Sequence, residues 1–149
     1  TTTLLKISKK NSLKSFDFGT DGKGYKDLIL PNNSKNMFMN GAKIAVFTLN
    51  IIPKFINNFL AANRINKKKI KYFLLHQASK YVCDKIRKKL NFKKNIFLNN
   101  YNKYGNTVSS SIPLLLETAI KNKKISRNDT IIACGFGVGL SWGIVEIKW

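Results

Sequence analysis

The feature that most constrains the fold is the alternation of short apolar runs with amphipathic helical patterns. Strand-like runs lie at residues 1–8, 72–75, 96–98, 130–134 and 143–147. Helical patterns with an apolar face every three or four positions lie at residues 37–63, 79–90 and 107–122. Strands that alternate with helices predict a sheet of mostly parallel strands covered by helices. We therefore expect an α/β fold with a mostly parallel five-stranded sheet.

Three local features refine this expectation. Residues 11–34 are polar and rich in glycine, and we expect them to form a surface excursion with at most a small strand or two. Pro53 falls inside the longest helical pattern and predicts a kink or a break there. The last two strands flank a glycine-rich turn and should pair antiparallel.

Length and composition indicate one soluble domain. The chain has 149 residues and a mean hydropathy of -0.19, and we find no run of the ~18 apolar residues that a membrane span requires. The N-terminus begins directly with a strand pattern, so we expect a piece of a longer chain, with a natural C-terminus. Cys83 and Cys134 show no spacing typical of a disulfide framework or a zinc site, which favours a reducing cytoplasm and predicts no metal site.

The chain is strongly basic. It has 27 Lys and Arg against 7 Asp and Glu, and 24 of the 27 basic residues are lysines. Such an excess attracts polyanions, which include nucleic acids, membrane surfaces and acidic proteins. The lysines are scattered in doublets and triplets at helix ends and loops, which also fits a plain compositional bias. The sequence contains no recognition-helix signature and no basic strand interleaved with aromatic residues, so nucleic acid is an unlikely partner.

Two polar motifs follow apolar runs and precede helices. His76 is the only histidine and ends the run at 72–75, and Gly105 and Asn106 precede the last helical pattern. The carboxyl ends of strands are where α/β folds place reactive side chains. An imidazole there exchanges protons near neutral pH, and Asn106 is either a helix cap or an amide donor facing a cleft. A purely structural histidine and a simple turn remain the alternatives.

A glycine-rich segment at residues 135–143 joins the last two strand patterns. Its sequence GFGVGLSWG alternates glycines with larger residues, and no helix follows it, which excludes a phosphate-binding loop. Alternating glycines let the backbone approach a ligand, where an N–H group can stabilise an oxyanion. A tight hairpin that needs positive φ is the alternative.

Taken together, these motifs resemble the C-terminal half of β-ketoacyl-acyl carrier protein synthase III, a condensing enzyme of the thiolase fold. The resemblance covers nearly the whole chain. It is carried by FGTDGKGYKDLILP, MNGAKIAVFTLNIIPKF, LLHQAS, YGNTVSSSIPLLL and GFGVGLSWG. The histidine of the HQA motif and the asparagine of the YGNT motif lie 30 positions apart, as in that family.

The resemblance implies a decarboxylative Claisen condensation in fatty acid biosynthesis. A cysteine takes an acyl group from acyl-CoA, and malonyl-acyl carrier protein then loses CO2 and attacks it. By motif match, His76 and Asn106 hold the thioester carbonyl oxygen, and the backbone N–H of Val138 serves the oxyanion hole. Gly41 and Ser79 match positions that contact pantetheine. The resemblance implies no cofactor, because CoA and phosphopantetheine thioesters are substrates.

The resemblance also implies partners and an assembly. Acyl carrier protein is acidic, and Lys80 and Lys85 lie near the position of a carrier-binding arginine that Tyr81 replaces here. The resemblance implies a cytoplasmic homodimer whose nucleophilic cysteine lies in the N-terminal half. Neither Cys83 nor Cys134 matches that cysteine, so the 149 residues alone should not complete a condensation.

Departures from the family pattern leave other functions open. Ser79 replaces the asparagine of the usual HQAN motif. This change keeps open a related acyltransferase, or a synthase of a specialised pathway. A basic nucleic-acid-binding domain and a non-catalytic half are further alternatives. The sequence does not determine the acyl chain length.

Overall fold

A computed structural model describes residues 1–3 and 12–149 of the chain. The described strands are β1 (Leu13–Thr20), β2 (Leu28–Ile29), β3 (Phe38–Met39), β4 (Ile70–Leu75), β5 (Thr130–Gly137) and β6 (Ser141–Lys148). The α-helices are α1 (Gly41–Ala62), α2 (Lys80–Lys89), α3 (Tyr101–Tyr104) and α4 (Ser111–Lys121). Three short 3-10 helices complete the set: η1 (Gly22–Asp27), η2 (Lys67–Lys69) and η3 (Val108–Ser110).

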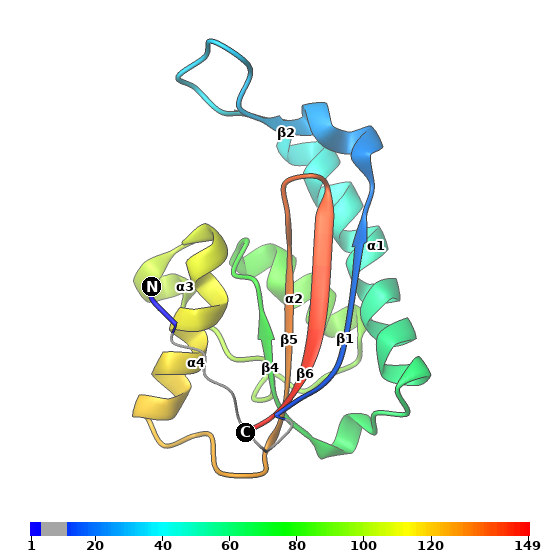
Figure 1. Cartoon of the computed structure of the whole chain (residues 1–149), viewed down its shortest axis with the longest axis vertical. Coiled ribbons are helices and arrows are strands. Elements are labelled where there is room, and N and C mark those ends of the chain that lie inside the picture. Colours follow the sequence, from blue (N-terminus) through cyan, green and yellow to red (C-terminus); the bar gives the residue numbers. More distant parts are fainter. Residues whose placement is uncertain (4–11) are drawn as a thin grey trace.

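The main sheet of the described residues has four strands in the order β1-β6-β5-β4 (Figure 1). Strand β5 runs parallel to β4 and antiparallel to β6, and β6 runs antiparallel to β1. Strands β2 and β3 form a separate antiparallel pair. The sheet is therefore mixed, with one parallel pair beside two antiparallel pairs.

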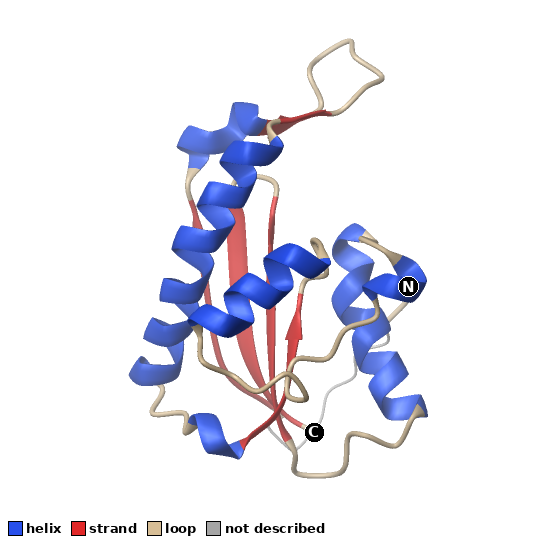
Figure 2. Ribbon diagram, turned by 180° about the vertical axis from the view of Figure 1, so that it is seen from behind, coloured by secondary structure: helices blue, strands red, loops and turns tan. Residues whose placement is uncertain are grey.

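Helices cover both faces of the sheet, and each face has its own core. Successive side chains of a strand point to opposite faces. On β4 and β5, Phe73, Leu75 and Ile132 pack with α1 and α2, while Leu74 and Ile131 pack with α4. Figure 2 shows α1 and α2 crossing one face, with α4 standing apart from them. The strands β4 and β5 are consequently apolar at nearly every position, as expected of strands buried on both sides.

Helix α1 is the longest element and runs without interruption through Pro53. The predicted break does not occur, and Pro53 is buried in the packed face. The predicted kink remains a prediction. By length and composition α1 is also apolar enough to cross a membrane, contrary to the sequence expectation. In this structure its inward residues Ile52, Ile56 and Phe59 pack in the first core with at most 2% exposure. That packing accounts for the inward part of the helix's apolar surface, while Val46 and Ile51 are exposed.

The largest error of the sequence prediction concerns β1. Residues 13–20 were expected to belong to a polar excursion, but they form an eight-residue edge strand paired with β6. Most β1 side chains are exposed, so the strand lacks the apolar pattern that marks a buried strand. Strand β1 forms because its backbone pairs with β6. The predicted strand at residues 1–8 falls mainly on residues 4–11, outside the described part of the chain, and residues 1–3 are not in a strand.

The expected five-stranded, mostly parallel sheet is also wrong for the described residues. The segment predicted as a strand at 96–98 makes only an isolated parallel bridge, from Phe97 to Phe73. Its contribution is instead a side-chain contact, because the rings of Phe73 and Phe97 stack with centroids 4.6 Å apart. The remaining predicted strands and α2 are confirmed. The last helical pattern is divided into η3 and α4, and α3 occupies part of the predicted turn before it.

We expect the aromatic cluster around Phe73 to contribute strongly to stability. Phe73 has no exposed surface and contacts the rings of Phe92 and Phe97. Phe73→Ala should lower the free energy of unfolding by ~3–5 kcal/mol because it removes apolar contacts and leaves a cavity. Chemical denaturation measures this change. Phe16→Ala is the matched control, since Phe16 is 72% exposed; equal losses in both variants would contradict the role of the cluster.

Candidate active site

His76 lies where the parallel pairing of β4 and β5 ends. Its backbone N–H donates to the carbonyl of Cys134 at 2.9 Å, which continues the strand pairing one residue beyond Leu75. Its ring meets the ring of Phe136 edge-on, with centroids 5.3 Å apart. The side chain is half-buried. Backbone pairing and an aromatic neighbour therefore place this imidazole at the carboxyl end of β4, as the sequence predicted.

A chain of hydrogen bonds joins His76 to Asn106. Nδ1 of His76 lies 2.7 Å from the hydroxyl oxygen of Ser111. That hydroxyl donates to the carbonyl of Val108 at 2.7 Å. The backbone N–H of Val108 in turn donates to Oδ1 of Asn106 at 2.9 Å. The two motifs, distant in sequence, thus form one hydrogen-bonded unit.

The contact with Val108 fixes which end of the Asn106 amide is available. A backbone N–H can only donate, so the atom of Asn106 that faces it must be the oxygen. The amide nitrogen, with two donor hydrogens, is left for another partner. Asn106 itself is exposed, and Gly105 before it has φ +65°, a conformation that favours glycine. Asn106 therefore closes a turn just before η3, whose N-cap position is Thr107, so it is not a helix cap. Its amide nitrogen is left as a donor, and the cleft that this donor would face remains a prediction.

Burial disfavours the charged form of His76. Desolvation lowers the pKa of His76 below its ordinary value of 6.5, and the hydrogen bond to the Val108 backbone opposes this shift. The ring is therefore neutral at physiological pH. A neutral imidazole carries one N–H, so it donates from one nitrogen and accepts at the other.

The glycine-rich segment forms the β5–β6 hairpin, which confirms the hairpin alternative. Its turn contains Gly139 with φ +138°, and a Cβ at Gly139 would come within 2.7 Å of the Ser141 backbone nitrogen. Only glycine fits this position. Val138 precedes it at the tip and is 60% exposed, so its side chain does not pack in the core. The role predicted for the Val138 N–H in an oxyanion hole remains a prediction.

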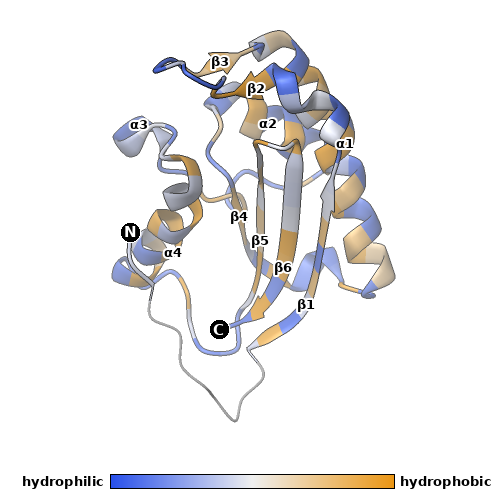
Figure 3. Cartoon of the chain, turned by 45° about the horizontal axis from the view of Figure 1, so that its top comes forward, coloured by the Kyte–Doolittle hydropathy of each residue, from blue (hydrophilic) through white to orange (hydrophobic). Residues whose placement is uncertain are grey.

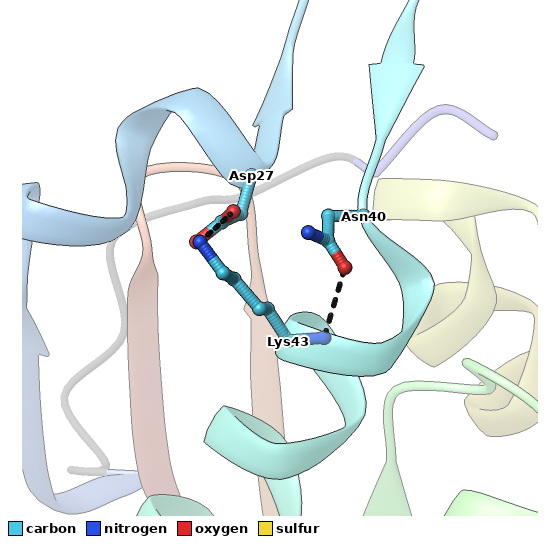
Figure 4. Close-up of polar contacts among 3 residues, drawn as sticks. All are labelled: Asp27, Asn40 and Lys43. Carbon is cyan, nitrogen blue, oxygen red and sulfur yellow. Dashed lines mark hydrogen bonds and ion pairs between the residues drawn. The ribbon is translucent and has the colours of Figure 1, made fainter.

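Gly41 is the first residue of α1, in a region held by two contacts (Figure 4). Oδ1 of Asn40 accepts from the backbone N–H of Lys43 at 3.2 Å and caps the helix. The ammonium of Lys43 lies 3.2 Å from a carboxylate oxygen of Asp27, at the end of η1. A Cβ built on Gly41 would meet nothing within 4 Å. The space beside Gly41 is open, as a pantetheine-contacting position would require, although the contact itself is untested.

Ser79 caps helix α2. Its hydroxyl oxygen accepts from the backbone N–H of Val82 at 3.2 Å. This bond uses the oxygen as an acceptor and leaves the hydroxyl proton free to donate. The capping role is a sufficient structural reason for a serine at this position. Its predicted contact with pantetheine remains a prediction.

The residues proposed to meet a carrier protein share the exposed face of α2. Lys80, Tyr81 and Lys85 line a surface depression of about 430 Å³ together with Asp84 and Lys88. The ammonium of Lys85 lies 5.4 Å above the ring of Tyr81. Three lysines surround a single carboxylate, so the depression is electropositive.

The two cysteines are structural. Both are buried, and burial raises the pKa of the Cys83 thiol to about 11 and that of Cys134 further. A reactive cysteine needs a lowered pKa and access to solvent, and these have neither. Within residues 1–3 and 12–149 there is also no cluster of three or more His, Cys, Asp or Glu side chains suited to a metal ion.

Residues 60–149 match the family model described as the C-terminal part of 3-oxoacyl-[acyl-carrier-protein] synthase III. The chain belongs to this synthase III family. The match includes the segments of His76, Asn106 and the β5–β6 hairpin.

Known members of the synthase III family resemble nearly the whole chain. A beta-ketoacyl-[acyl-carrier-protein] synthase III of Prochlorococcus marinus is 36% identical over 93% of this chain, and one of Staphylococcus aureus is 34% identical over 96%. Both alignments cover 46% of the relative. The crystal structure of the Aquifex aeolicus synthase III is 26% identical and superposes with a TM-score of 0.88, over 96% of this chain and 46% of that one. The chain spans about half the length of the curated relatives it matches.

The structure adds one residue to the site that the sequence did not single out. Ser111 joins His76 to the Asn106 turn, but it lies within a run of three serines, Ser109 to Ser111, with no mark to distinguish it. Only its position at the start of α4, facing inward with 1% exposure, separates it from its neighbours. Helical periodicity gives a weak signal, since Ser111 precedes Leu115 and Ala119 on the buried face.

We expect His76 to make stability depend on pH. Its pKa is lowered in the folded chain, so at intermediate pH the unfolded chain binds a proton that the folded chain does not. This contribution to stability is complete above the unfolded pKa of about 6.5 and is lost as the pH falls through the lowered folded value.

His76→Asn tests this expectation, because asparagine keeps a donor near Ser111 but does not titrate. Urea denaturation between about pH 7.5 and pH 5 should show a larger loss of stability in the original chain than in the variant. Parallel pH profiles for the two proteins would show that His76 does not titrate differently on folding.

Proposed function

We propose that this chain is the C-terminal half of a 3-oxoacyl-acyl carrier protein synthase III. The whole enzyme would join an acyl group from acyl-CoA to malonyl-acyl carrier protein with loss of CO2, a step of fatty acid biosynthesis. Loss of CO2 leaves an enolate whose negative charge collects on the thioester oxygen. Hydrogen-bond donors placed at that oxygen lower the barrier, because they stabilise charge as it develops. This half supplies such donors, while the nucleophilic cysteine belongs to the other half.

The observation that carries the proposal is the single hydrogen-bonded unit of His76, Ser111, Val108 and Asn106. It fixes the Asn106 amide with its nitrogen available and connects it, through Val108 and Ser111, to an imidazole at a strand end. A simple acyl transfer forms no enolate and has no need for an asparagine donor. The same unit therefore favours condensation over the related acyltransferase activity.

Within the described residues, an exposed apolar surface on β1 supports packing against an N-terminal half. Phe16 and Phe18 on β1 are 72% and 75% exposed. Phe16 pairs with Val145, so the two side chains lie on the same face of the sheet. Helix α4 packs on this face beside β4 and β5. Figure 3 shows hydrophobic and hydrophilic colours alternating along the edge strand β1. We propose that the other half of the enzyme covers this surface, and that the complete protein is a cytoplasmic homodimer.

The electropositive depression on α2 supports binding of acyl carrier protein. An acidic partner is attracted by the lysines around Tyr81, and such attraction raises the association rate more than the final affinity. Malonyl-phosphopantetheine carried by that partner would then pass Ser79 and Gly41 toward His76. This route uses the residues that the family resemblance implies for pantetheine.

Removal of the Asn106 amide should slow decarboxylation sharply. We expect Asn106→Ala to reduce kcat for malonyl-carrier protein decarboxylation ~10²–10³-fold, the usual cost of deleting one oxyanion donor. The assay uses this chain joined to its N-terminal half, or to that of a related synthase III. Asn102→Ala is the matched control, since Asn102 is an exposed asparagine of α3. A normal rate in the Asn106 variant would argue for acyl transfer without an enolate.

Neutralising the α2 lysines should weaken carrier-protein binding at low salt. In the same two-half enzyme, Lys80→Gln with Lys85→Gln should raise KM for malonyl-carrier protein several-fold at low ionic strength. The effect should fade as salt shortens the Debye length to ~8 Å at 0.15 M. The control changes Lys123 and Lys124, beyond the end of α4, to glutamine and alters net charge equally. If both double variants raise KM alike, net charge rather than this surface attracts the partner.

A further inference from the structure

Gln77, the residue after the candidate histidine, has a buried side-chain amide with a hydrogen bond at each end. The residue is 1% exposed. Its Nε2 donates to the carbonyl of Leu75 at 2.7 Å, and its Oε1 accepts from the backbone N–H of Asn100 at 3.2 Å. A carbonyl can only accept and a backbone N–H can only donate, so these contacts fix which end of the amide faces each partner. One side chain thus joins the end of β4 to the segment that begins α3.

The two partners of this amide are the next rung of an interrupted ladder. The N–H of Phe73 donates to the carbonyl of Ile96 at 2.8 Å, and the carbonyl of Phe73 accepts from the N–H of Leu98 at 3.2 Å. A parallel ladder repeats every two residues, so the next bond would join the Asn100 N–H to the Leu75 carbonyl. Each of these groups instead bonds to one end of the glutamine amide. The amide therefore acts as a spacer between the two segments, and the bridge before it stays isolated.

Backbone hydrogen bonds connect this spacer to the turn that carries Asn106. The carbonyl of Asn100 accepts from the N–H of Tyr104 at 3.0 Å, and the carbonyl of Tyr101 accepts from the N–H of Gly105 at 2.9 Å. These bonds close the single turn of α3 directly before Asn106. A displacement of Asn100 would therefore be passed to Asn106 through a short, hydrogen-bonded segment.

We propose that Gln77 is a positioning residue that sets the spacing between His76 and Asn106. This inference rests on the proposed function, in which both residues donate to one oxygen. Gln77 adjoins His76 in the chain and holds Asn106 from one side through Asn100 and α3. The contacts of Ser111 hold Asn106 from the other side. Without the spacer, the segment at Asn100 would close onto β4 and carry the amide donor away from its place.

Two substitutions separate the hydrogen bonds of Gln77 from its volume. Gln77→Met fills a similar space but makes neither hydrogen bond. In Gln77→Glu, an ionised carboxylate accepts from Asn100 but cannot donate to Leu75, whereas the protonated acid can do both. Burial raises the pKa of a carboxyl group, so the protonated form should gain population as the pH falls from about 9 to 6. The Gln77→Glu variant therefore compares one protein with and without the second hydrogen bond.

Decarboxylation of malonyl-carrier protein by the two-half enzyme tests the positioning role. Gln77→Met should lower kcat ~10–100-fold, because a misplaced donor stabilises the enolate poorly, and should leave KM nearly unchanged. The activity of Gln77→Glu, relative to the unmodified enzyme at the same pH, should rise as the pH falls. Ile56→Val is the control for a buried change outside the site, since Ile56 is a fully buried residue of α1, and its kcat should be normal.

Hydrogen–deuterium exchange of the same proteins, measured by mass spectrometry, gives a result independent of activity. Residues 101–108 should exchange faster in Gln77→Met and not in Ile56→Val. A normal kcat or unchanged exchange in Gln77→Met would overturn the proposal. So would Gln77→Glu if its relative activity stayed as low as that of Gln77→Met down to about pH 6. If the unmodified two-half enzyme does not decarboxylate, the proposed function fails, and exchange alone decides whether Gln77 holds the segment.

Discussion

The pairing of β5 with two neighbours is the constraint on which the rest of the structure depends. Strand β5 runs parallel to β4 on one side and antiparallel to β6 on the other, and its residues 130–134 are buried. A strand buried on both faces must place its backbone groups in ladders, since unpaired polar groups are costly away from water. The ladder with β4 reaches Cys134, whose carbonyl accepts from His76. The histidine proposed to be catalytic is thus placed by the same hydrogen bonds that build the sheet.

Asn106, the second polar residue of the candidate site, is placed by a turn rather than by a strand. Gly105 adopts a backbone conformation that favours glycine, and Asn106 then closes the turn by accepting from Val108. Ser111 at the start of α4 carries the connection back to His76. Because α4 packs against β4 and β5, a change in the sheet would move both ends of the network together. A rigid scaffold of this kind suits the proposal that His76 and Asn106 donate to one oxygen.

Only the folded structure shows where the basic residues of the chain lie and what they contact. Most lysines are dispersed, and several serve the fold itself. Lys43 pairs with Asp27, and Lys67 donates to the Leu90 carbonyl. The lysines of α2, by contrast, gather around one surface depression. Lys71, Lys94 and Lys124 line a second depression. The α2 depression supports the proposal of an acidic protein partner because it lies beside Ser79.

The sequence by itself determined the elements whose side chains carry a periodic apolar pattern. Helices α1 and α2 and strands β4, β5 and β6 are all of this kind, and His76 directly follows β4. The pattern also led to the synthase III family. The family motifs are short runs of residues in a fixed order, so they can be identified from the sequence alone.

Tertiary structure alone decided what depends on partners distant in the chain. The edge strand β1 exists because β6 offers unpaired backbone groups, although most of its own side chains are exposed. Pro53 stays inside a continuous helix because its surroundings are packed, overriding the local preference to break. The segment at 96–98 fails to extend the sheet, while Phe97 still stacks on Phe73. Ser111 became part of the site only through a contact across 35 positions of sequence, because hydrogen bonding depends on distance in space and leaves no mark in a run of identical residues.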